Sequence, residues 1–426
     1  AGLKDDTLRV ALDLTAEWNA IQKDSDVPSQ LITGVVVARK AFIEENPEAV
    51  SAFMDSYAAS VDFVNANIDE AAELVGKYEI VPAAVAQKAI PACNITFIAG
   101  GEMKQALSGY RGTIGVYNYK TGEILCAVTS PSYDPDHVPD VANDTTGSYE
   151  GVYVNRFFDA SYTPGSIFKL VTAAAALETI PDVQSRTFQC SGKTIIGGQE
   201  IICNGVHGSL TLFGALAHSC NVAFGELAAE LGAETLQDYA EKLGLIGSFS
   251  CEGYTVASGK IDLSQADDGD VAWAGIGQYT DQVSAPAFLR YMGAIANGGQ
   301  AAEPYLMQRV RKGDDITYEA KTVLSDAVLK PETADTLTKL MRNNVQSVYG
   351  DWQFGGLSVC AKSGTAEREG QTANAMFAGF ALDSSCPVAF VVFVENGGSG
   401  SAVAAPMAAK VLQTCAQVLS AEAAAK

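Results

Sequence analysis

Thr163-Pro164-Gly165-Ser166-Ile167-Phe168-Lys169, followed by the apolar run Leu170-Val171-Thr172-Ala173-Ala174-Ala175-Ala176-Leu177, predicts the start of a buried helix. Ser166 and Lys169 are three residues apart and share a helix face, so the amine can reach the hydroxyl. A serine becomes nucleophilic when a base takes its proton, and a lysine among apolar neighbours loses basicity through desolvation. The pattern is a candidate acyl-transfer site; alone, it also fits a helix N-cap followed by a solvated lysine.

Two further polar motifs follow in the order that this chemistry requires. Ser219-Cys220-Asn221 lies between helical patterns at 210–217 and 222–232 and is predicted to be a short loop. Lys362-Ser363-Gly364-Thr365 closes an extended stretch just before an apolar strand predicted at 375–382. Taken singly, Ser219-Cys220-Asn221 also fits a plain turn, and Lys362 also fits an exposed charged residue that keeps an edge strand from pairing with another chain. The ordered set of three favours a catalytic interpretation of each motif.

The ordered trio resembles the active site of the penicillin-binding transpeptidases, within the penicillin-recognising serine enzymes. Trp273-Ala274-Gly275-Ile276-Gly277-Gln278 and Ile295-Ala296-Asn297-Gly298-Gly299 also resemble segments found between the second and third motifs of that family. The resemblance covers about residues 109–426. It implies a serine D,D-transpeptidase, with carboxypeptidase activity as an option, that cross-links peptidoglycan stem peptides through an acyl-enzyme and that β-lactams acylate.

The resemblance implies a role for each residue of the first two motifs. Ser166 attacks the carbonyl carbon of a D-Ala-D-Ala peptide bond or of a β-lactam, and Lys169 is the general base. Ser219 relays a proton to the leaving group. Asn221 holds Lys169 and the substrate amide.

The third motif is expected to bind the substrate carboxylate. Lys362 supplies positive charge, and the hydroxyls of Ser363 and Thr365 bind the carboxylate directly. The backbone N–H groups of Ser166 and Thr365 form the oxyanion hole. Gly364 is expected to lack a side chain so that substrate can approach the strand.

Two other function classes remain alternatives. A β-lactamase or β-lactam sensor would share Ser-x-x-Lys and the lysine strand, and Ile167-Phe168 between the serine and the lysine is found in one lactamase class. The Ser219-Cys220-Asn221 motif, the Ser363-Gly364-Thr365 ending and the lack of an obvious deacylating glutamate favour the transpeptidase. A solute-binding module is the third option.

The strand and helix patterns predict an α+β fold with an antiparallel sheet. Alternating segments at 112–119 and 123–129 flank Lys120-Thr121-Gly122 and predict one hairpin, and segments at 375–382 and 387–395 predict another. A helix is expected at 402–419, and Ala-rich helical patterns fill the middle of the chain. The family resemblance implies a five-stranded sheet with flanking helices beside an all-helical part, with the active site between them.

Residues 1–108 do not fit that pattern, so we predict two parts, 1–108 and 109–426. Helix starts are predicted at Asn46-Pro47-Glu48, Asn67 and Pro82. The stretch 31–42, with 46–50 and 81–86, resembles part of the solute-binding proteins of ABC importers, whose two lobes need far more than ~108 residues. This segment is therefore interpreted as a mostly helical fragment without importer-like binding. A helical pattern at 102–107 makes the boundary between the two parts uncertain by about ten residues. The N-terminal pedestal domain usual in large penicillin-binding proteins is not recognisable, so the sequence leaves open whether the enzyme serves cell elongation or cell division.

Charge and hydropathy indicate an exported enzyme. The formal net charge of −22, without a basic cluster, argues against binding nucleic acid or anionic lipid. No apolar run approaches the ~20 residues of a membrane span, and no signal peptide opens the chain. The family is usually tethered outside the cytoplasmic membrane, so we expect an extracytoplasmic enzyme of the bacterial cell envelope, with its anchor absent from this chain and with cell-wall synthesis partners. No cofactor is implied.

Nine cysteines leave at least one thiol unpaired within the chain. Cys190 and Cys203 lie on either side of a predicted hairpin at 193–202. If its loop were centred on Ile196-Gly197, the sulfur atoms of the two cysteines would face each other, and a register shift of one residue would separate them. A disulfide and buried thiols both remain open. Cys203 and His207 fit part of a zinc site, but no full set of four ligands is visible, so no metal is predicted. His207 and His218 are interpreted as ordinary polar residues, and Cys220 as an apolar filler.

Overall fold

The computed structural model describes residues 47–78, 82–90, 110–134, 136–251, 254–312, 315–368 and 370–424. The chain divides into two compact units, residues 1–109 and 110–426. The stretch 31–42 and the helical pattern predicted at 102–107 lie outside the described residues.

The first unit contains three described helices, α3 (Pro47–Ala66), α4 (Ile68–Lys77) and α5 (Ala83–Ala89). The three predicted helix starts are confirmed, with Asn67 and Pro82 as the N-caps of α4 and α5. Ala71, Ala72 and Ala86 form a small core with Ile90, in which short side chains let the helices approach closely.

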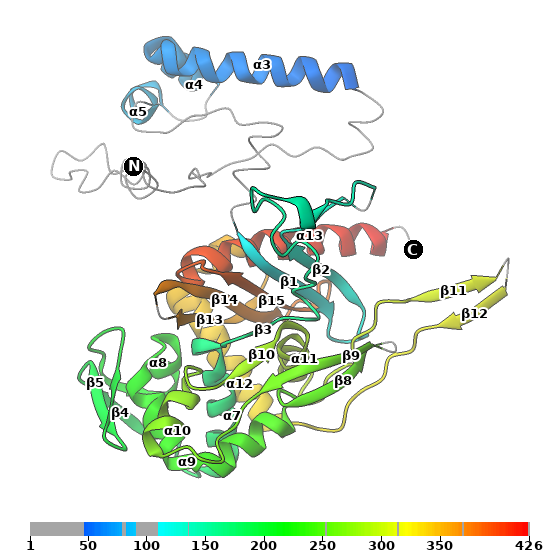
Figure 1. Ribbon diagram of the computed structural model, residues 1–426. Coiled ribbons are helices and arrows are strands. Elements are labelled where there is room, and N and C mark those ends of the chain that lie inside the picture. Colours follow the sequence, from blue (N-terminus) through cyan, green and yellow to red (C-terminus); the bar gives the residue numbers. More distant parts are fainter. Residues whose placement is uncertain are drawn as a thin grey trace. The chain divides into compact units, whose positions relative to one another are not determined.

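A five-stranded antiparallel sheet forms the centre of the second unit (Figure 1). Its strand order is β13-β14-β15-β1-β2, so strands from the two ends of the unit lie next to each other. Both predicted hairpins are confirmed. The strands are β1 (Arg111–Asn118), β2 (Ile124–Ser130), β13 (Val359–Arg368), β14 (Gln371–Ala381) and β15 (Val388–Glu395).

Helices cover both faces of this sheet, because alternate residues of β15 point to opposite sides. Phe390 and Val392 belong to the core that contains α13 (Ala405–Ala424), whereas Val391 and Phe393 belong to the core that contains α11 (Ala285–Ala296). The helix predicted at 402–419 is confirmed, with a π-helical turn, η8 (Gly400–Ala404), before it. Figure 1 shows α13 and α11 on opposite sides of the sheet.

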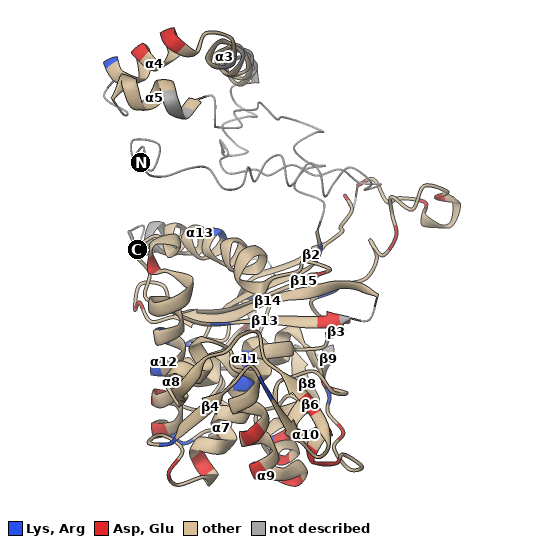
Figure 2. Ribbon diagram, turned by 90° about the vertical axis from the view of Figure 1, so that its left-hand side faces the viewer, with Lys and Arg blue, Asp and Glu red and all other residues tan. Residues whose placement is uncertain are grey.

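The helical part of the unit surrounds α7 (Lys169–Thr179), in which residues 169–176 are all buried. The alanines of α7 let its neighbours pack closely around it. Figure 2 shows acidic positions on α9 and α10 in this part. The other helices are α8 (Leu212–Ala217), α9 (Asn221–Lys242), α10 (Asp268–Gly275) and α12 (Pro331–Asn344), with short turns η4 (Val141–Asn143), η5 (Gly165–Phe168), η6 (Val345–Tyr349) and η7 (Asp351–Phe354).

The remaining described strands form small sheets around this helical part. The order in the largest is β3-β10-β9-β8, and the others are the pairs β4-β7, β5-β6 and β11-β12. Their bounds are β3 (Ser161–Tyr162), β4 (Thr187–Cys190), β5 (Lys193–Ile196), β6 (Gln199–Ile202), β7 (Gly208–Thr211), β8 (Gly247–Cys251), β9 (Tyr254–Lys260), β10 (Gln282–Ser284), β11 (Arg309–Lys312) and β12 (Asp315–Glu319). The α+β prediction is thus confirmed.

The start of one predicted helix and the turn of one predicted hairpin differ from the structure by one or two residues. The helical pattern at 210–217 begins in β7, and Thr211 caps the helix by accepting a hydrogen bond from the N–H of Gly214. The hairpin at 193–202 forms, but it turns at Gly197-Gly198, both of which have positive φ (56° and 81°). Two glycines at these positions permit a tight turn that Ile196 would not. The hairpin register therefore does not set Cys190 opposite Cys203.

We predict that Gly293→Ala destabilises the second unit. An added Cβ would lie 1.5 Å from Tyr117 Oη, where α11 packs on β1. Overpacking of this kind typically costs about 1–3 kcal/mol of unfolding free energy. Denaturant unfolding should show this loss.

Tyr117→Phe is the matched control for that experiment. The Tyr117 hydroxyl is buried and has no hydrogen-bond partner among the described residues, so its removal alone should not destabilise the protein. Added to Gly293→Ala, it should restore part of the loss, because the nearest clashing atom is gone while the ring carbon Tyr117 Cζ, at 2.5 Å, remains. Strict additivity of the two changes would contradict the proposed contact.

Candidate active site

The turn η5 and the first residue of α7 bring Ser166 and Lys169 together. Ser166 is half-buried, Lys169 is fully buried, and Lys169 Nζ lies 2.9 Å from Ser166 Oγ. The alternative of a solvated lysine is wrong. The i, i+3 spacing predicted this contact, because the turn is helical throughout.

Two carbonyl oxygens also lie near the Lys169 amine, and each can only accept a hydrogen bond from it. Its Nζ lies 2.8 Å from the backbone oxygen of Ser219 and 2.7 Å from Asn221 Oδ1. Ser219 Oγ is also near, at 3.1 Å. Burial lowers the pKa of Lys169 to about 7, and the nearby thiols of Cys203 and Cys220 oppose this shift. The amine can therefore be neutral near neutral pH.

The second motif occupies the tight turn between α8 and α9. Ser219 has a φ of 53°, which is uncommon for a residue with a side chain. The predicted loop is confirmed for Ser219 and Cys220, and Asn221 is the first residue of α9. Asn221 Nδ2 donates to the backbone oxygen of Ile202 at 2.8 Å, which directs Oδ1 toward Lys169. One amide hydrogen of Asn221 remains for another ligand.

Lys362 lies on the edge strand β13 and is fully buried, so the interpretation as an exposed edge guard is wrong. Its Nζ donates to Ser219 Oγ at 3.1 Å and to the backbone oxygen of Ser363 at 2.8 Å. Burial lowers the pKa of Lys362, and the charge of Lys169 adds to this effect. The ligand-free site thus disfavours the positive charge that the sequence analysis assigned to Lys362.

Gly364 has a packing reason for lacking a side chain, besides the one we expected. A Cβ at this position would lie 2.9 Å from the backbone oxygen of Pro164 and 3.0 Å from Ile167 Cγ2. Similarly, a Cβ at Gly165 would lie 2.5 Å from the backbone oxygen of Thr365. The glycines therefore let the Ser166 turn pack directly against β13, and the role of Gly364 in substrate approach stays a prediction.

Ser363 and Thr365 are held by residues that the sequence analysis did not assign to the site. Tyr349 Oη lies 2.9 Å from Ser363 Oγ and accepts the Ser363 N–H at 3.0 Å. Gln278 Nε2 donates to the backbone oxygen of Thr365 at 3.2 Å. Gln278 lay in a segment noted for its family resemblance, but no pattern near Tyr349 indicated its contact.

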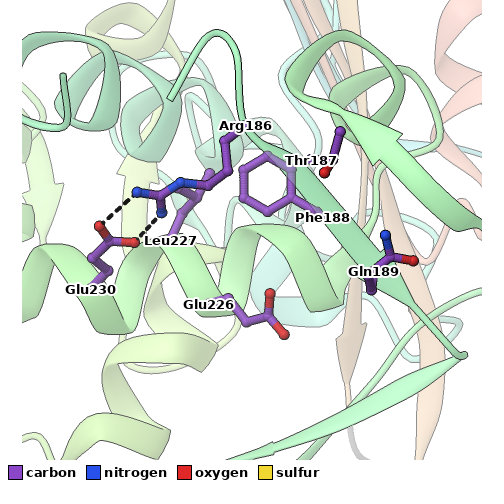
Figure 3. Close-up of a pocket in the computed structure, with 7 residues that line it drawn as sticks. All are labelled: Arg186, Thr187, Phe188, Gln189, Glu226, Leu227 and Glu230. Carbon is purple, nitrogen blue, oxygen red and sulfur yellow. Dashed lines mark hydrogen bonds and ion pairs between the residues drawn. The ribbon is translucent and has the colours of Figure 1, made fainter. Parts of the chain in front are cut away.

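A separate pocket lies on the helical part between β4 and α9 (Figure 3). Its volume is about 290 Å³, and Arg186, Phe188, Glu226 and Glu230 are among its lining residues. Arg186 forms ion pairs with Glu230 and Asp182, so its charge is already balanced. The pocket contains none of the residues of the three motifs.

Comparison with known proteins identifies this arrangement. The family model described as the penicillin binding protein transpeptidase domain matches residues 112–413.

The chain belongs to the penicillin-binding protein transpeptidase family.

It is 30% identical over 338 residues to the peptidoglycan D,D-transpeptidase PbpA of Mycobacterium tuberculosis, a match that covers 72% of this chain and 67% of PbpA. It is 29% identical over 279 residues to the probable peptidoglycan D,D-transpeptidase FtsI of Caulobacter vibrioides, covering 63% of this chain and 44% of that protein.

Solved structures of the family are also similar. The ceftriaxone acyl-enzyme complex of penicillin-binding protein A from M. tuberculosis has a TM-score of 0.66 and 27% identity, and covers 72% of this chain and 74% of that one. The D,D-transpeptidase domain of a peptidoglycan glycosyltransferase from Eggerthella lenta has a TM-score of 0.65 and 26% identity, covering 75% and 80%. Residues 1–108 precede the family match, and their resemblance to a solute-binding protein stays a prediction.

One helix in the described part of the chain, 400–419, has the length and hydropathy of a membrane span. Its buried residues include Ala405, Ala408 and Leu412, which pack in the core beneath the sheet. Core helices of soluble proteins have the same properties, so this helix gives only weak evidence of a membrane span.

We predict that Tyr349→Phe loosens β13 at Ser363. Loss of the hydroxyl leaves the Ser363 N–H without its acceptor, which should lower the free energy of unfolding by about 1–2 kcal/mol. Hydrogen exchange at the Ser363 amide should become faster.

Tyr291→Phe is a matched control, since its buried hydroxyl donates to the backbone oxygen of Leu170 at 2.9 Å. It should reduce stability without selectively exposing the Ser363 amide. Unchanged exchange at Ser363 in Tyr349→Phe would show that this hydrogen bond does not hold the strand.

Proposed function

We propose that this chain is a serine D,D-transpeptidase that cross-links peptidoglycan stem peptides through an acyl-enzyme on Ser166, and that β-lactams acylate the same hydroxyl. The observation that carries the proposal is the buried Lys169 amine, 2.9 Å from Ser166 Oγ. Membership of the family and similarity to named D,D-transpeptidases support the same activity.

Lys169 acts as the base that activates Ser166. In the neutral amine, the two N–H groups point to the backbone oxygen of Ser219 and to Asn221 Oδ1, which leaves the lone pair for the Ser166 hydroxyl hydrogen. Ser166 Oγ transfers its proton to Lys169 as it attacks the carbonyl carbon of the substrate. Backbone N–H groups of Ser166 and Thr365 stabilise the resulting oxyanion.

Collapse of the tetrahedral intermediate requires a proton on the leaving amine. Ser219 Oγ lies 3.1 Å from both Lys169 Nζ and Lys362 Nζ, so it can accept a proton from one ammonium and donate its own. The D-Ala amine leaves with that proton, and the acyl-enzyme remains. An acceptor amine then attacks the ester and gives its proton to the same relay. The ester C–O bond breaks as Lys169 returns a proton to Ser166 Oγ, and water as the acceptor would give carboxypeptidase activity.

The third motif binds the substrate carboxylate in this proposal. A carboxylate beside Lys362 would favour the charged form of the amine, which burial by itself disfavours. The half-buried Ser363 hydroxyl and the exposed Thr365 hydroxyl supply two further donors. Binding would thus place the charge on Lys362 only when substrate is present.

A β-lactamase remains the second candidate, because it would use the same acylation step. It would also need a group that activates water for deacylation. Among the described residues, no aspartate or glutamate is hydrogen-bonded to Ser166, Lys169 or Lys362. A long-lived acyl-enzyme is therefore expected.

The cellular setting follows from the substrate. The named relatives are peptidoglycan D,D-transpeptidases, and we propose an extracytoplasmic enzyme of the cell envelope. A neighbour at TM-score 0.61 and 26% identity comes from a peptidoglycan synthase complex, which supports a partner in cell-wall synthesis. We also propose that residues 109–426 contain the catalytic domain and that 1–108 are a separate segment.

Penicillin should form one covalent adduct on Ser166, which intact-protein mass spectrometry followed by peptide mapping can detect. The adduct should be absent in Ser166→Ala and should persist for many minutes, because no carboxylate of the described residues is hydrogen-bonded to Ser166, Lys169 or Lys362. Hydrolysis within seconds would favour a β-lactamase. An adduct on Cys220, or none on the folded protein, would refute the assignment.

The acylation rate constant should rise with pH and level off above the Lys169 pKa of about 7. The sign follows because only the neutral amine accepts the Ser166 proton. Stopped-flow measurements between about pH 5 and pH 9 test this, and Lys169→Ala should lower the plateau by ~10²–10⁴-fold.

Lys120→Ala is a control for that profile, since Lys120 is exposed and bonded to Asn297. It should keep the parental rate and midpoint. A flat profile in the parent, or a parental rate in folded Lys169→Ala, would make Lys169 a structural residue.

A further inference from the structure

Four metal-ligating side chains converge beside the active site. They come from the end of β4 (Cys190), the residue after β6 (Cys203), the loop before β7 (His207) and the turn before α9 (Cys220). Their ligand atoms all lie within 4.8 Å of one another. The sequence analysis had considered only Cys203 and His207 of these four as zinc ligands.

We propose that Cys190, Cys203, His207 and Cys220 bind one Zn²⁺ ion, which holds the Ser219–Asn221 turn in place. Three cysteines and one histidine are an established ligand set for structural zinc. Binding would displace the thiol protons, since zinc takes the thiolate form of cysteine.

Two distances within the cluster match those of tetrahedral zinc, and the others are no longer than 4.8 Å. Cys203 Sγ lies 3.8 Å from Cys220 Sγ and 3.6 Å from His207 Nδ1. A tetrahedral centre with Zn–S of ~2.3 Å and Zn–N of ~2.05 Å has edges of about 3.8 Å between sulfurs and about 3.6 Å between sulfur and nitrogen. Only small side-chain adjustments are then needed for all four atoms to reach one ion.

Backbone N–H groups already point at two of the sulfurs. The N–H of Asn221 donates to Cys203 Sγ at 3.2 Å, and that of Ala223 donates to Cys220 Sγ at 3.5 Å. Such outer hydrogen bonds orient and stabilise thiolate ligands. Cys190 and Cys220 are buried while Cys203 and His207 are half-buried, so an ion can enter from one side of the cluster.

A disulfide accounts for less of this arrangement. All the described cysteines are free thiols. A bond between any two of these cysteines would leave the third sulfur and His207 without a role.

The local fold also needs a cross-link. β4-β7 and β5-β6 are isolated two-stranded ribbons, which are marginally stable in water. Ile195 and Ile202 on the second ribbon are 70% and 58% exposed, whereas Ile201 is buried in the core, so hydrophobic packing holds only one face of this ribbon. A zinc ion would join both ribbons to the start of α9.

The cluster is connected to the catalytic motif through adjacent residues. Cys220 separates Ser219 from Asn221, and Asn221 Nδ2 is hydrogen-bonded to Ile202, the residue before Cys203. Fixing both cysteines therefore fixes the turn that carries the acceptors of Lys169. This part of the inference rests on the proposed function, whereas metal binding itself does not.

The first experiment measures zinc in the full chain after purification under reducing conditions and dialysis. About one zinc per chain is expected by elemental analysis. Cys190→Ser and His207→Ala should each lower zinc affinity by at least ~10-fold. Cys126→Ser, a half-buried cysteine outside the cluster, and His218→Ala, whose ring stacks on His207 at 5.3 Å, should keep the zinc.

Co²⁺ substitution of the parent chain provides a test that does not depend on the variants folding. Tetrahedral thiolate-bound cobalt should give intense visible absorption that Zn²⁺ abolishes. Failure of the apo-protein to bind either ion, equal binding by the cluster variants and controls, or a mass 2 Da lower from a Cys203–Cys220 disulfide would each overturn the proposal.

Removal of zinc with a chelator should lower the thermal midpoint and slow penicillin acylation, and both should recover when Zn²⁺ is added back. Zinc binding without any effect on acylation would limit the ion to the ribbons and overturn its role at the Ser219–Asn221 turn. If the zinc-loaded parent did not react with penicillin, the proposed function would fail while the metal site stood.

Discussion

The burial of the Lys169 amine is the constraint on which the rest of the site depends. A buried ammonium ion is costly, so the amine is held near the pH at which it loses its proton, and its pKa falls to about 7. Two separate segments then have to meet it: the Ser166 turn and the Ser219–Asn221 turn at the start of α9. Residues 169–176 of the alanine-rich α7 are all buried, which makes that depth possible, because small side chains let the neighbouring helices close around the amine.

Close packing of backbone against backbone provides the second half of the site. Gly165 and Gly364 allow the Ser166 turn to lie directly on β13, where any side chain would collide with main-chain atoms. β13 is the edge strand of the sheet, so its outward N–H and C=O groups remain available to a ligand or to residues such as Tyr349. Lys362 enters the site from this strand and meets Ser219, which joins the two halves.

Local patterns in the sequence predicted much of this arrangement. The i, i+3 spacing predicted the contact of Ser166 with Lys169, and alternation of apolar residues predicted the two hairpins that form most of the sheet. Contacts made by tertiary packing left no such pattern. Tyr349 reaches Ser363 from a π-helical turn, the Gly197-Gly198 turn shifted a register by one residue, and Cys190 and Cys220 join Cys203 only because two ribbons fold onto the start of α9.

The protonation state of Lys169 in the ligand-free enzyme is the most direct test of this account. Neutron diffraction from crystals held about one pH unit above the Lys169 pKa of about 7 would locate the hydrogens. We expect two hydrogens on Nζ, directed at the Ser219 backbone oxygen and at Asn221 Oδ1, with the Ser166 hydroxyl hydrogen pointing at Nζ. Three hydrogens on Nζ, one of them directed at Ser166 Oγ, would contradict the account.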